Sequence, residues 1–387
     1  MWPLPATSKR GTGSGRGARF GRWTSRVRGA GEIFGELPVA CLAEEIEPPG
    51  DGQIRALFTL AGNPVVSTPN SDRLAAAFDS LDFMVSVDVY LNETTRRADV
   101  ILPAPSHLER SHYDLAFYSL SIRNVANYSP PVLERPAGMP DEWETLLRLA
   151  AIAGGAGADA DVDALDDLIA ADAAGRAGVE PDPARRGPER ILDMMLRGGA
   201  YGISLADLEA APHGVDLGPL EPRLPEVLRT ASGKVELAPE PIVADVERLH
   251  ASLAVERNGG MVLIGRRHLR SNNSWMNALG PLATGPNRCT ALVNPADAAR
   301  LGIEDGATVV VRSRTGEIQI PAEVTEDLMP GVVSIPHGWE HANSNVLADE
   351  QLLEPLTGTA VLNGIPVEVA PLGNQVEQGG VLVEGGA

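Results

Sequence analysis

The pattern of hydrophobic and polar positions is clearest in the first third of the chain. A short apolar run, a tight turn and a run with apolar residues on one helical face follow each other, and two further apolar runs come after them. The pattern predicts a strand over 54–60, a turn over 61–64 and a helix over 73–81. Two further strands are predicted over 83–89 and 100–102. This order is a βαβ unit, and strands this apolar predict a parallel sheet covered on both faces.

A second patterned region begins at residue 260 and has the short period of β structure. Strands are expected over 261–265, 308–313, 317–324, 332–335 and 365–369, with one more strand before a short helix over 295–301. The segment between the two regions is rich in Ala, Gly, Asp and Pro, and it predicts weakly amphipathic helices joined by loops. The sequence therefore predicts an α/β region, a helical connection and a β region.

Two polar segments fall at the carboxyl ends of the predicted parallel strands, where ligands of such sheets bind. One is the turn Gly62-Asn63-Pro64, in which Gly62 lets the backbone bend sharply and come close to a ligand. Asn63, Ser67 and Thr68 offer donors suited to phosphate or ribose oxygens. The turn favours a nucleotide site, and an ordinary structural turn is the alternative.

The other polar segment begins at Asp88, where the second strand ends, and continues through Asn92 to Thr94. The carboxylate of Asp88 can accept hydrogen bonds from ribose hydroxyls or from the N–H groups at the edge of guanine. The alternative is that Asp88 caps a helix or is a surface acid. The sequence has no GxGxxG motif, so the usual NAD fingerprint is absent.

These segments, AGNPVVSTPN at 61–70 and SVDVYLNETTRRADVILPAPSHLER at 86–110, closely resemble the third domain of molybdopterin-dependent oxidoreductases. This is the superfamily of formate dehydrogenase, nitrate reductase and dimethyl sulfoxide reductase. The resemblance implies a Rossmann-like parallel-sheet domain that binds one guanine nucleotide of a bis(molybdopterin guanine dinucleotide) cofactor, bis-MGD, carrying molybdenum or tungsten. The cofactor contacts that it implies here are Gly62, Asn63, Pro64, Ser67, Asp88, Asn92 and Thr94.

The region from residue 260 resembles the fourth domain of the same superfamily, a six-stranded double-psi β-barrel that covers the cofactor. Its first strand is followed by a polar loop, in which Arg266 and Arg267 suit phosphates because guanidinium forks match them. Asn273 and Ser274 suit a heterocycle, and an ordinary surface loop is the alternative. Together with the PHGW-like stretch at 336–339, the expected contacts are Gly265, Arg266, Arg267, Asn273, Ser274, Trp275, His337, Trp339, Asn343 and Asn345.

The expected organisation follows from the pattern and the resemblance together. A basic, disordered leader (1–30) is followed by a Rossmann-like dinucleotide-binding domain (31–150) and a helical and irregular connection (151–258). A double-psi barrel domain (259–372) and a disordered tail (373–387) complete the chain. The leader has seven Lys and Arg residues and no acid, so a basic arm or targeting segment is its alternative interpretation. Glu44, Glu45 and Glu47 are expected to form a solvated face.

Composition narrows the function classes. The net charge of −20 weighs against nonspecific nucleic-acid binding, and no run of 18 apolar residues predicts a membrane span. The two cysteines, Cys41 and Cys289, are far apart and cannot form the four-thiolate site of an iron–sulfur cluster. The composition is typical of a cytoplasmic globular protein.

Histidines offer no clear catalytic or metal site. His107 and His112 lie near Glu109 and Arg110, where they could act as acid, base or ligands, but a hydrogen-bonded loop is the preferred interpretation. His337 and His341 have the spacing of a metal pair without an evident third ligand. We therefore assign no catalytic residue and no metal ligand.

The resemblance covers roughly residues 31–372 and only the C-terminal half of the family. Those enzymes begin with an iron–sulfur domain or its remnant, and they supply a protein ligand to the metal. The expected function is the dinucleotide-binding part of a molybdenum or tungsten oxidoreductase, lacking those domains and inactive alone. A separate polypeptide carrying the N-terminal domains, or an electron-transfer subunit, is the expected partner.

Two other functions compete with this one. The first is a non-catalytic module that binds the nucleotide cofactor or a subunit, which metal analysis would distinguish from an enzyme. The second, a thiamine-diphosphate or NAD Rossmann protein, would leave the barrel motifs unexplained. The sequence does not indicate the substrate.

Overall fold

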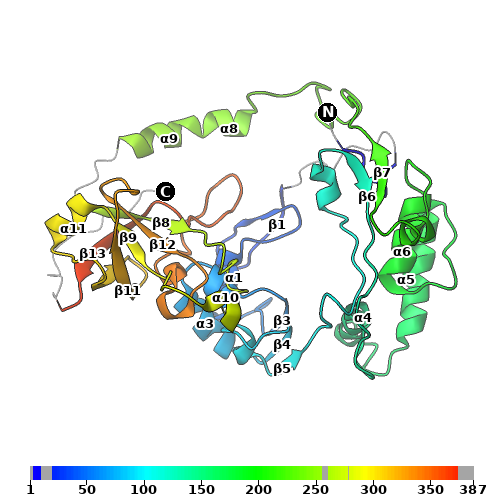
Figure 1. Cartoon of the computed structure of the whole chain (residues 1–387), viewed down its shortest axis with the longest axis horizontal. Coiled ribbons are helices and arrows are strands. Elements are labelled where there is room, and N and C mark those ends of the chain that lie inside the picture. The colour runs from blue at the N-terminus through cyan, green and yellow to red at the C-terminus, as the bar shows by residue number, and fades with distance from the viewer. Residues whose placement is uncertain (1–2, 10–19, 255–259, 278, 374–387) are drawn as a thin grey trace. The chain divides into compact units, whose positions relative to one another are not determined.

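The computed structural model describes residues 3–9, 20–254, 260–277 and 279–373. The chain forms two compact units (Figure 1), which we call unit 1 and unit 2. Unit 1 consists of Met1–Gly17 and Pro103–Leu237, and unit 2 consists of Ala18–Leu102 and Ala238–Ala387. The predicted dinucleotide-binding segment, 31–150, therefore contributes to both units.

A three-stranded parallel sheet in unit 2 confirms the predicted βαβ unit. Its strand order is β3-β4-β5, and Leu57 pairs with Met84 in the ladder between β3 and β4. Leu74 and Phe78 of α3 are buried against Met84, so the apolar face of this helix forms the core beside the sheet. The elements are β3 (Ala56–Leu60), α2 (Pro64–Ser67), α3 (Ser71–Asp79), β4 (Phe83–Val87), η2 (Thr95–Arg97) and β5 (Val100–Leu102).

Burial of the sheet differs between its strands. The central strand β4 is buried over its last four residues, as a strand covered on both faces should be. On the edge strand β3, Phe58 and Leu60 remain 45% and 58% exposed. The prediction of cover on both faces therefore holds for β4 and is wrong for β3.

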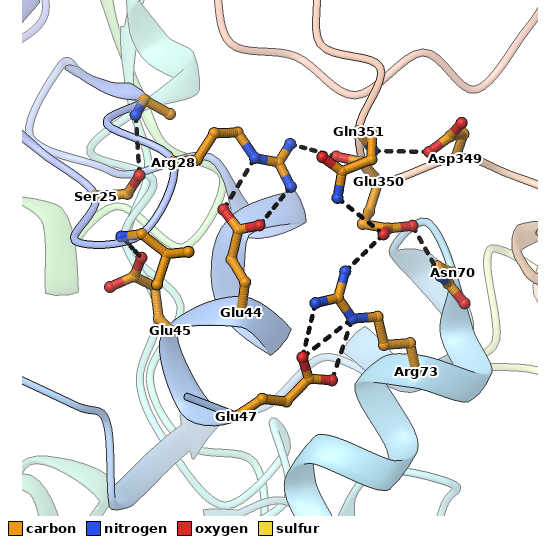
Figure 2. A network of polar contacts seen from close by, with 12 residues as sticks. Ser25, Arg28, Glu44, Glu45, Glu47, Asn70, Arg73, Asp349, Glu350 and Gln351 are labelled. Carbon is orange, nitrogen blue, oxygen red and sulfur yellow. Dashed lines mark hydrogen bonds and ion pairs between the residues drawn. The ribbon is translucent and has the colours of Figure 1, made fainter. Parts of the chain in front are cut away.

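The N-terminal part of unit 2 differs from the expected disorder over residues 20–30. β1 (Phe20–Thr24) pairs with β2 (Gly31–Ile33), and η1 (Val39–Cys41) leads into α1 (Leu42–Ile46). Glu44 and Glu45 were expected to be solvated but are 7% and 6% exposed. Arg28 forms an ion pair with Glu44 (Figure 2). The backbone N–H of Arg26 donates to Glu45. Basic residues of the predicted leader thus neutralise buried acids. Residues 10–19 of the predicted leader lie outside the described residues.

A closed six-stranded barrel makes up the rest of unit 2 and confirms the predicted number of strands. Its order is β10-β11-β9-β12-β8-β13, and β8 and β9 run parallel to β12 and β11. Alternate residues such as Val309, Val311 and Ile320 fill its interior. The strands are β8 (Met261–Arg266), β9 (Ala291–Val293), β10 (Thr308–Arg312), β11 (Glu317–Val324), β12 (Val332–Pro336) and β13 (Ile365–Pro371).

Short helices connect the barrel strands and precede the first of them. They are α8 (Glu240–Ala244), α9 (Val246–Leu253), α10 (Gly280–Ala283), α11 (Pro295–Leu301), η4 (Glu340–Ala342) and η5 (Ser344–Val346). Asn294 caps α11 by accepting from the Ala296 N–H, and Gly302 ends it in the left-handed region. The predicted tail lies outside the described residues from residue 374 on.

Unit 1 is mainly helical, as the composition of its central part predicts. Leu192, Leu196, Leu205 and Leu208 are buried in one core cluster with Tyr128. The elements are η3 (Phe117–Leu120), β6 (Asn124–Ala126), α4 (Glu142–Ala153), α5 (Val162–Ala177), α6 (Gly187–Arg197), α7 (Leu205–Glu209) and β7 (Val215–Gly218). Among the helices of the described residues, none is both long enough and apolar enough to span a membrane.

Candidate functional site

The turn after β3 has the backbone that the sequence predicts. Gly62 has a φ of +78°, and a Cβ atom at this position would meet nothing within 4 Å. The glycine is thus required by backbone conformation and not by close packing, and the space beside it is open. The next residue, Asn63, is buried and precedes α2, whose first residue is Pro64.

The side chain of Asn63 joins three segments. Its Oδ1 accepts a hydrogen bond from Thr94 Oγ1 at 2.7 Å, and its Nδ2 donates to Glu93. The same Nδ2 lies 3.4 Å from Ser274 Oγ on the barrel loop after β8. Burial raises the pKa of Glu93, but the hydrogen bond from Asn63 helps to lower it overall. Asn63 therefore brings the two predicted halves of the site into contact.

The strand-end segment 88–95 is held by its own side chains. Asp88 is buried, accepts from the Tyr90 N–H at 2.9 Å and lies 3.4 Å from Asn92 Nδ2. Asn92 Oδ1 accepts from the N–H groups of Thr94 and Thr95 at 3.0 and 2.9 Å. This turn orients a carboxylate at the end of β4, next to the residues that Asn63 contacts.

The barrel loop after β8 has a tightly constrained backbone. Asn272 and Asn273 have φ values of 41° and 63°, and Arg267 donates to Asn273 Oδ1 at 3.0 Å. Gly338 lies against this loop, since a Cβ atom there would be 2.0 Å from the carbonyl oxygen of Asn273. A larger residue at 338 would push the loop and Ser274 away.

Three buried polar atoms at this loop have no hydrogen-bond partner among the described residues. They are Asn277 Oδ1, His337 Nε2 and Trp339 Nε1. Asn277 Nδ2 donates to the carbonyl of Gly338, which lies between the other two residues in sequence. Buried polar atoms are normally paired, so this group offers a donor and acceptors for a bound heterocycle. Burial, and then the charge of Arg267, lower the pKa of His337.

Two arginines that the sequence analysis missed converge beside this loop. Arg270 Nη1 and Arg288 Nη1 lie 3.5 and 3.0 Å from the same oxygen, Thr284 O. Neither has a carboxylate within ion-pair distance among the described residues, although most arginines described in unit 2 do. Burial, and then Arg288, Arg266 and Arg270, lower the pKa of His268, which reflects this concentration of positive charge. The sequence signal was the absence of Asp and Glu between residues 266 and 288 in an acidic chain, which does not by itself pair Arg270 with Arg288.

Arg266 is placed differently from Arg267. Its guanidinium is half-buried and donates to the carbonyls of Ser334 and Thr290 at 3.1 and 3.0 Å. Burial lowers the pKa of Arg266, and Glu323 partly compensates. Arg266 thus holds the barrel wall together, while Arg267 is exposed on the loop.

The remaining predicted contacts are not brought into this group. Asn343 and Asn345 are buried, and their side-chain amides donate to the backbone carbonyls of Val65 and Val66 in α2. Ser67 is exposed, Trp275 is 57% exposed, and the Gly265 N–H donates to Asn363 Oδ1 within the barrel. Their contacts with a cofactor stay predictions.

Comparison with known proteins identifies the family. The family model described as "Molybdopterin oxidoreductase" matches residues 16–135, and a molybdopterin dinucleotide-binding domain model matches residues 261–366. The chain belongs to the molybdopterin oxidoreductase superfamily. The second matched range covers most of the barrel and the loop with Ser274, and the first contains Asn63 and Asp88.

Curated relatives agree with this family. The chain is 27% identical over 317 residues to the F420-dependent formate dehydrogenase subunit alpha of Methanocaldococcus jannaschii, which covers 78% of this chain and 41% of the relative. It is 27% identical over 329 residues to the assimilatory nitrate reductase catalytic subunit of Bacillus subtilis, covering 80% of this chain and 41% of the relative. The chain thus spans about two fifths of the length of these relatives.

A solved structure supports the fold. Acetylene hydratase from Pelobacter acetylenicus matches with a TM-score of 0.63 and 18% identity, over 87% of this chain and 46% of that chain. At this identity the match supports the arrangement of strands and helices, not the activity.

Proposed function

We propose that this chain binds molybdopterin guanine dinucleotide at the junction between its parallel sheet and its barrel. In this proposal the sheet domain is Rossmann-like, the barrel is of the double-psi type, and the bound form is bis-MGD with molybdenum or tungsten. The observation that carries the proposal is the pair Arg270 and Arg288. Both guanidinium groups lie at one carbonyl oxygen, and neither forms an ion pair with a carboxylate of the described residues. In a chain with a net charge of −20, such a pair suits a bound polyanion.

The residues present fit such a ligand. Asp88 offers a carboxylate for the N–H groups of guanine, and Arg267, Arg270 and Arg288 offer charge for the phosphates. The unpaired atoms of Asn277, His337 and Trp339 suit a polar heterocycle. When bound, the dithiolene-held metal would supply the redox chemistry, while this chain binds and orients the dinucleotide.

The activity that we propose for the complete assembly is a molybdenum or tungsten oxidoreductase of the formate dehydrogenase or nitrate reductase type. The support is the family membership, together with relatives whose names describe alpha or catalytic subunits. We propose a separate polypeptide or an electron-transfer subunit as the partner, and the cytoplasm as the location.

Calorimetric titration with guanosine diphosphate (GDP) tests the binding proposal without the labile pterin. The full chain is expected to bind GDP saturably and adenosine diphosphate much more weakly, because Asp88 is matched to guanine. Metal analysis of chain isolated from a host that makes the cofactor is the second arm. Equal heats for the two nucleotides, with no molybdenum, tungsten or guanine nucleotide retained, would refute the proposal.

A further inference from the structure

The segment 343–351, which we call the junction segment, connects the barrel with α2 and α3. On one side, Leu347 and Ala348 are buried in the barrel core. On the other, the amides of Asn343 and Asn345 donate to backbone carbonyls of α2 at 3.3 and 2.6 Å. The segment thus belongs to the barrel by its apolar residues and to the helices by its polar ones.

Glu350 is the most connected residue of the junction segment (Figure 2). Its carboxylate accepts from Asn70 Nδ2 at 2.8 Å, from Arg73 Nη1 at 2.7 Å and from Gln351 Nε2 at 3.1 Å. Its backbone carbonyl accepts from Arg28 Nη1 at 2.6 Å. One residue of the junction segment therefore contacts both α3 and Arg28, which lies between β1 and β2.

The contacts continue outward with alternating charge. Arg28 also donates to both carboxylate oxygens of Glu44 at 2.9 Å, and Arg73 to Glu47 at 2.7 Å. Figure 2 shows that Arg28 contacts both Glu350 and Glu44, and that Arg73 contacts both Glu350 and Glu47. The network therefore fixes three parts of unit 2 with bidentate, directional contacts.

Burial of the Glu350 carboxylate restricts the geometry of this network. Glu350 is only 6% exposed. Burial raises its pKa, but hydrogen bonds from Gln351, Asn70 and Arg73 outweigh this and lower it to about 2. A buried carboxylate tolerates few geometries, because any shift of the barrel leaves the charge without partners.

A short path leads from Glu350 to both sides of the candidate site. Asn63 directly precedes α2, which leads into α3 and its Arg73. The junction segment follows β12, which pairs with β8 in the barrel, and β8 leads into the loop with Ser274. A displacement at Glu350 would therefore appear as a displacement between Ser274 and Asn63.

We propose that Glu350 is a positioning residue that holds the barrel against α3 so that the two halves of the nucleotide site meet. The identity of the ligand rests on the proposed function, whereas the placement of the barrel against α3 does not depend on it. Glu350 touches neither Asn63 nor Ser274 and acts through α3 and β12.

Spin labels on the full chain test the geometry directly. Ala76→Cys on α3 and Gln319→Cys on β11 are exposed positions, whereas the native Cys41 and Cys289 are buried. The distance distribution between the labels should be narrow in the parent and broader or shifted in Glu350→Ala. The matched control is Arg312→Ala, which removes an exposed ion pair with Glu317 between β10 and β11 and should leave the distribution unchanged.

Glu350→Gln keeps the size of the side chain and guards against failure of the alanine variant to fold. Circular dichroism confirms the fold of each variant before labelling. An unchanged distribution in a folded Glu350→Gln or Glu350→Ala chain overturns the proposal. If both variants broaden it and Arg312→Ala does not, the proposal stands.

The same variants are titrated with GDP well below their unfolding temperature. Glu350→Ala should weaken binding roughly 10-fold, the scale of coupling through a shared backbone shift, and Glu350→Gln should do so less. Broadened distances with unchanged GDP affinity would overturn the positioning role. If the parent binds no GDP, the proposed function fails, and the label distances alone still decide whether Glu350 sets the geometry.

Discussion

Asn63 Nδ2 lies 3.4 Å from Ser274 Oγ, although the two residues are 211 positions apart in the chain. The first belongs to the turn after a strand of the parallel sheet, and the second to the loop after the first barrel strand. The contact shows that the two segments singled out in the sequence meet in unit 2.

Replacing Asn63 by alanine should both destabilise the fold and weaken nucleotide binding. The change removes the acceptor of the buried Thr94 hydroxyl and one donor to the Glu93 carboxylate. The free energy of unfolding should fall by about 1–3 kcal/mol, the usual cost of an unsatisfied buried group. Urea unfolding measures this, with Asn127→Ala at an exposed asparagine as the control, expected within about 0.5 kcal/mol of the parent. Equal losses in the two variants would contradict the role of Asn63.

Asp88→Ala should remove the preference for guanine. Loss of a charge-assisted hydrogen bond to the base should cost about 1.5–3 kcal/mol of binding free energy. Calorimetry with GDP and inosine diphosphate, which lacks the exocyclic amine, measures the preference directly. The parent should prefer GDP, the variant should bind both alike, and the exposed control Asp72→Ala should behave as the parent. A preserved preference in Asp88→Ala would assign this carboxylate to the turn alone.

Arg270→Ala and Arg288→Ala should each weaken GDP binding by about 1.5–3 kcal/mol and reduce its dependence on salt. Without ligand, the same changes should not lower the free energy of unfolding, because each relieves repulsion between two cations on Thr284 O. Titrations at two salt concentrations and urea unfolding measure the two effects. Arg148→Ala in unit 1, whose guanidinium contacts a carbonyl and no described acid, is the matched control. Loss of stability with unchanged binding would show that these arginines serve the fold.

Stability should decrease between pH 7.5 and pH 5.5 because of His337 and His268. Burial lowers the pKa of both below the ordinary 6.5, so the unfolded state binds more protons over this range. The two neutral histidines contribute fully to the free energy of unfolding above the unfolded-state pKa of about 6.5. This contribution is lost as the pH falls through their lower pKa values in the folded state. The unfolding temperature of His337→Gln should therefore depend less on pH than that of the parent. Identical pH profiles would exclude His337 as a source of this dependence.

Periodicity predicted the βαβ unit and the six barrel strands because these elements are fixed by local patterns of burial. The strands around Met84 and Val309, for example, are buried as the sequence indicates. Residues 20–30 could not be predicted in this way. Their order comes from Arg28 and Arg26 contacting acids of α1, and such pairings depend on tertiary placement.

In the candidate site, too, local features could be predicted from the sequence, whereas contacts between distant segments could not. The turn at Gly62 and the carboxylate of Asp88 follow from the ends of strands, which the sequence reveals. Arg270 and Arg288 were missed because only the fold shows that they share a carbonyl and no described acid. The resemblance implies a cofactor contact for Asn343, which stays a prediction, and it did not reveal that the amide of Asn343 donates to α2. Pairing of side chains across segments is what the sequence alone did not reveal.

Photolabelling of the full chain with 8-azido-GDP, followed by peptide mass spectrometry, locates the nucleotide on the chain. We expect labels on peptides from both sides of the junction, 61–68 or 88–95 and 266–277. Excess GDP should prevent labelling and adenosine diphosphate should not. Labelling confined to unit 1, or labelling that GDP does not prevent, would contradict a guanine dinucleotide site where Asn63 meets Ser274.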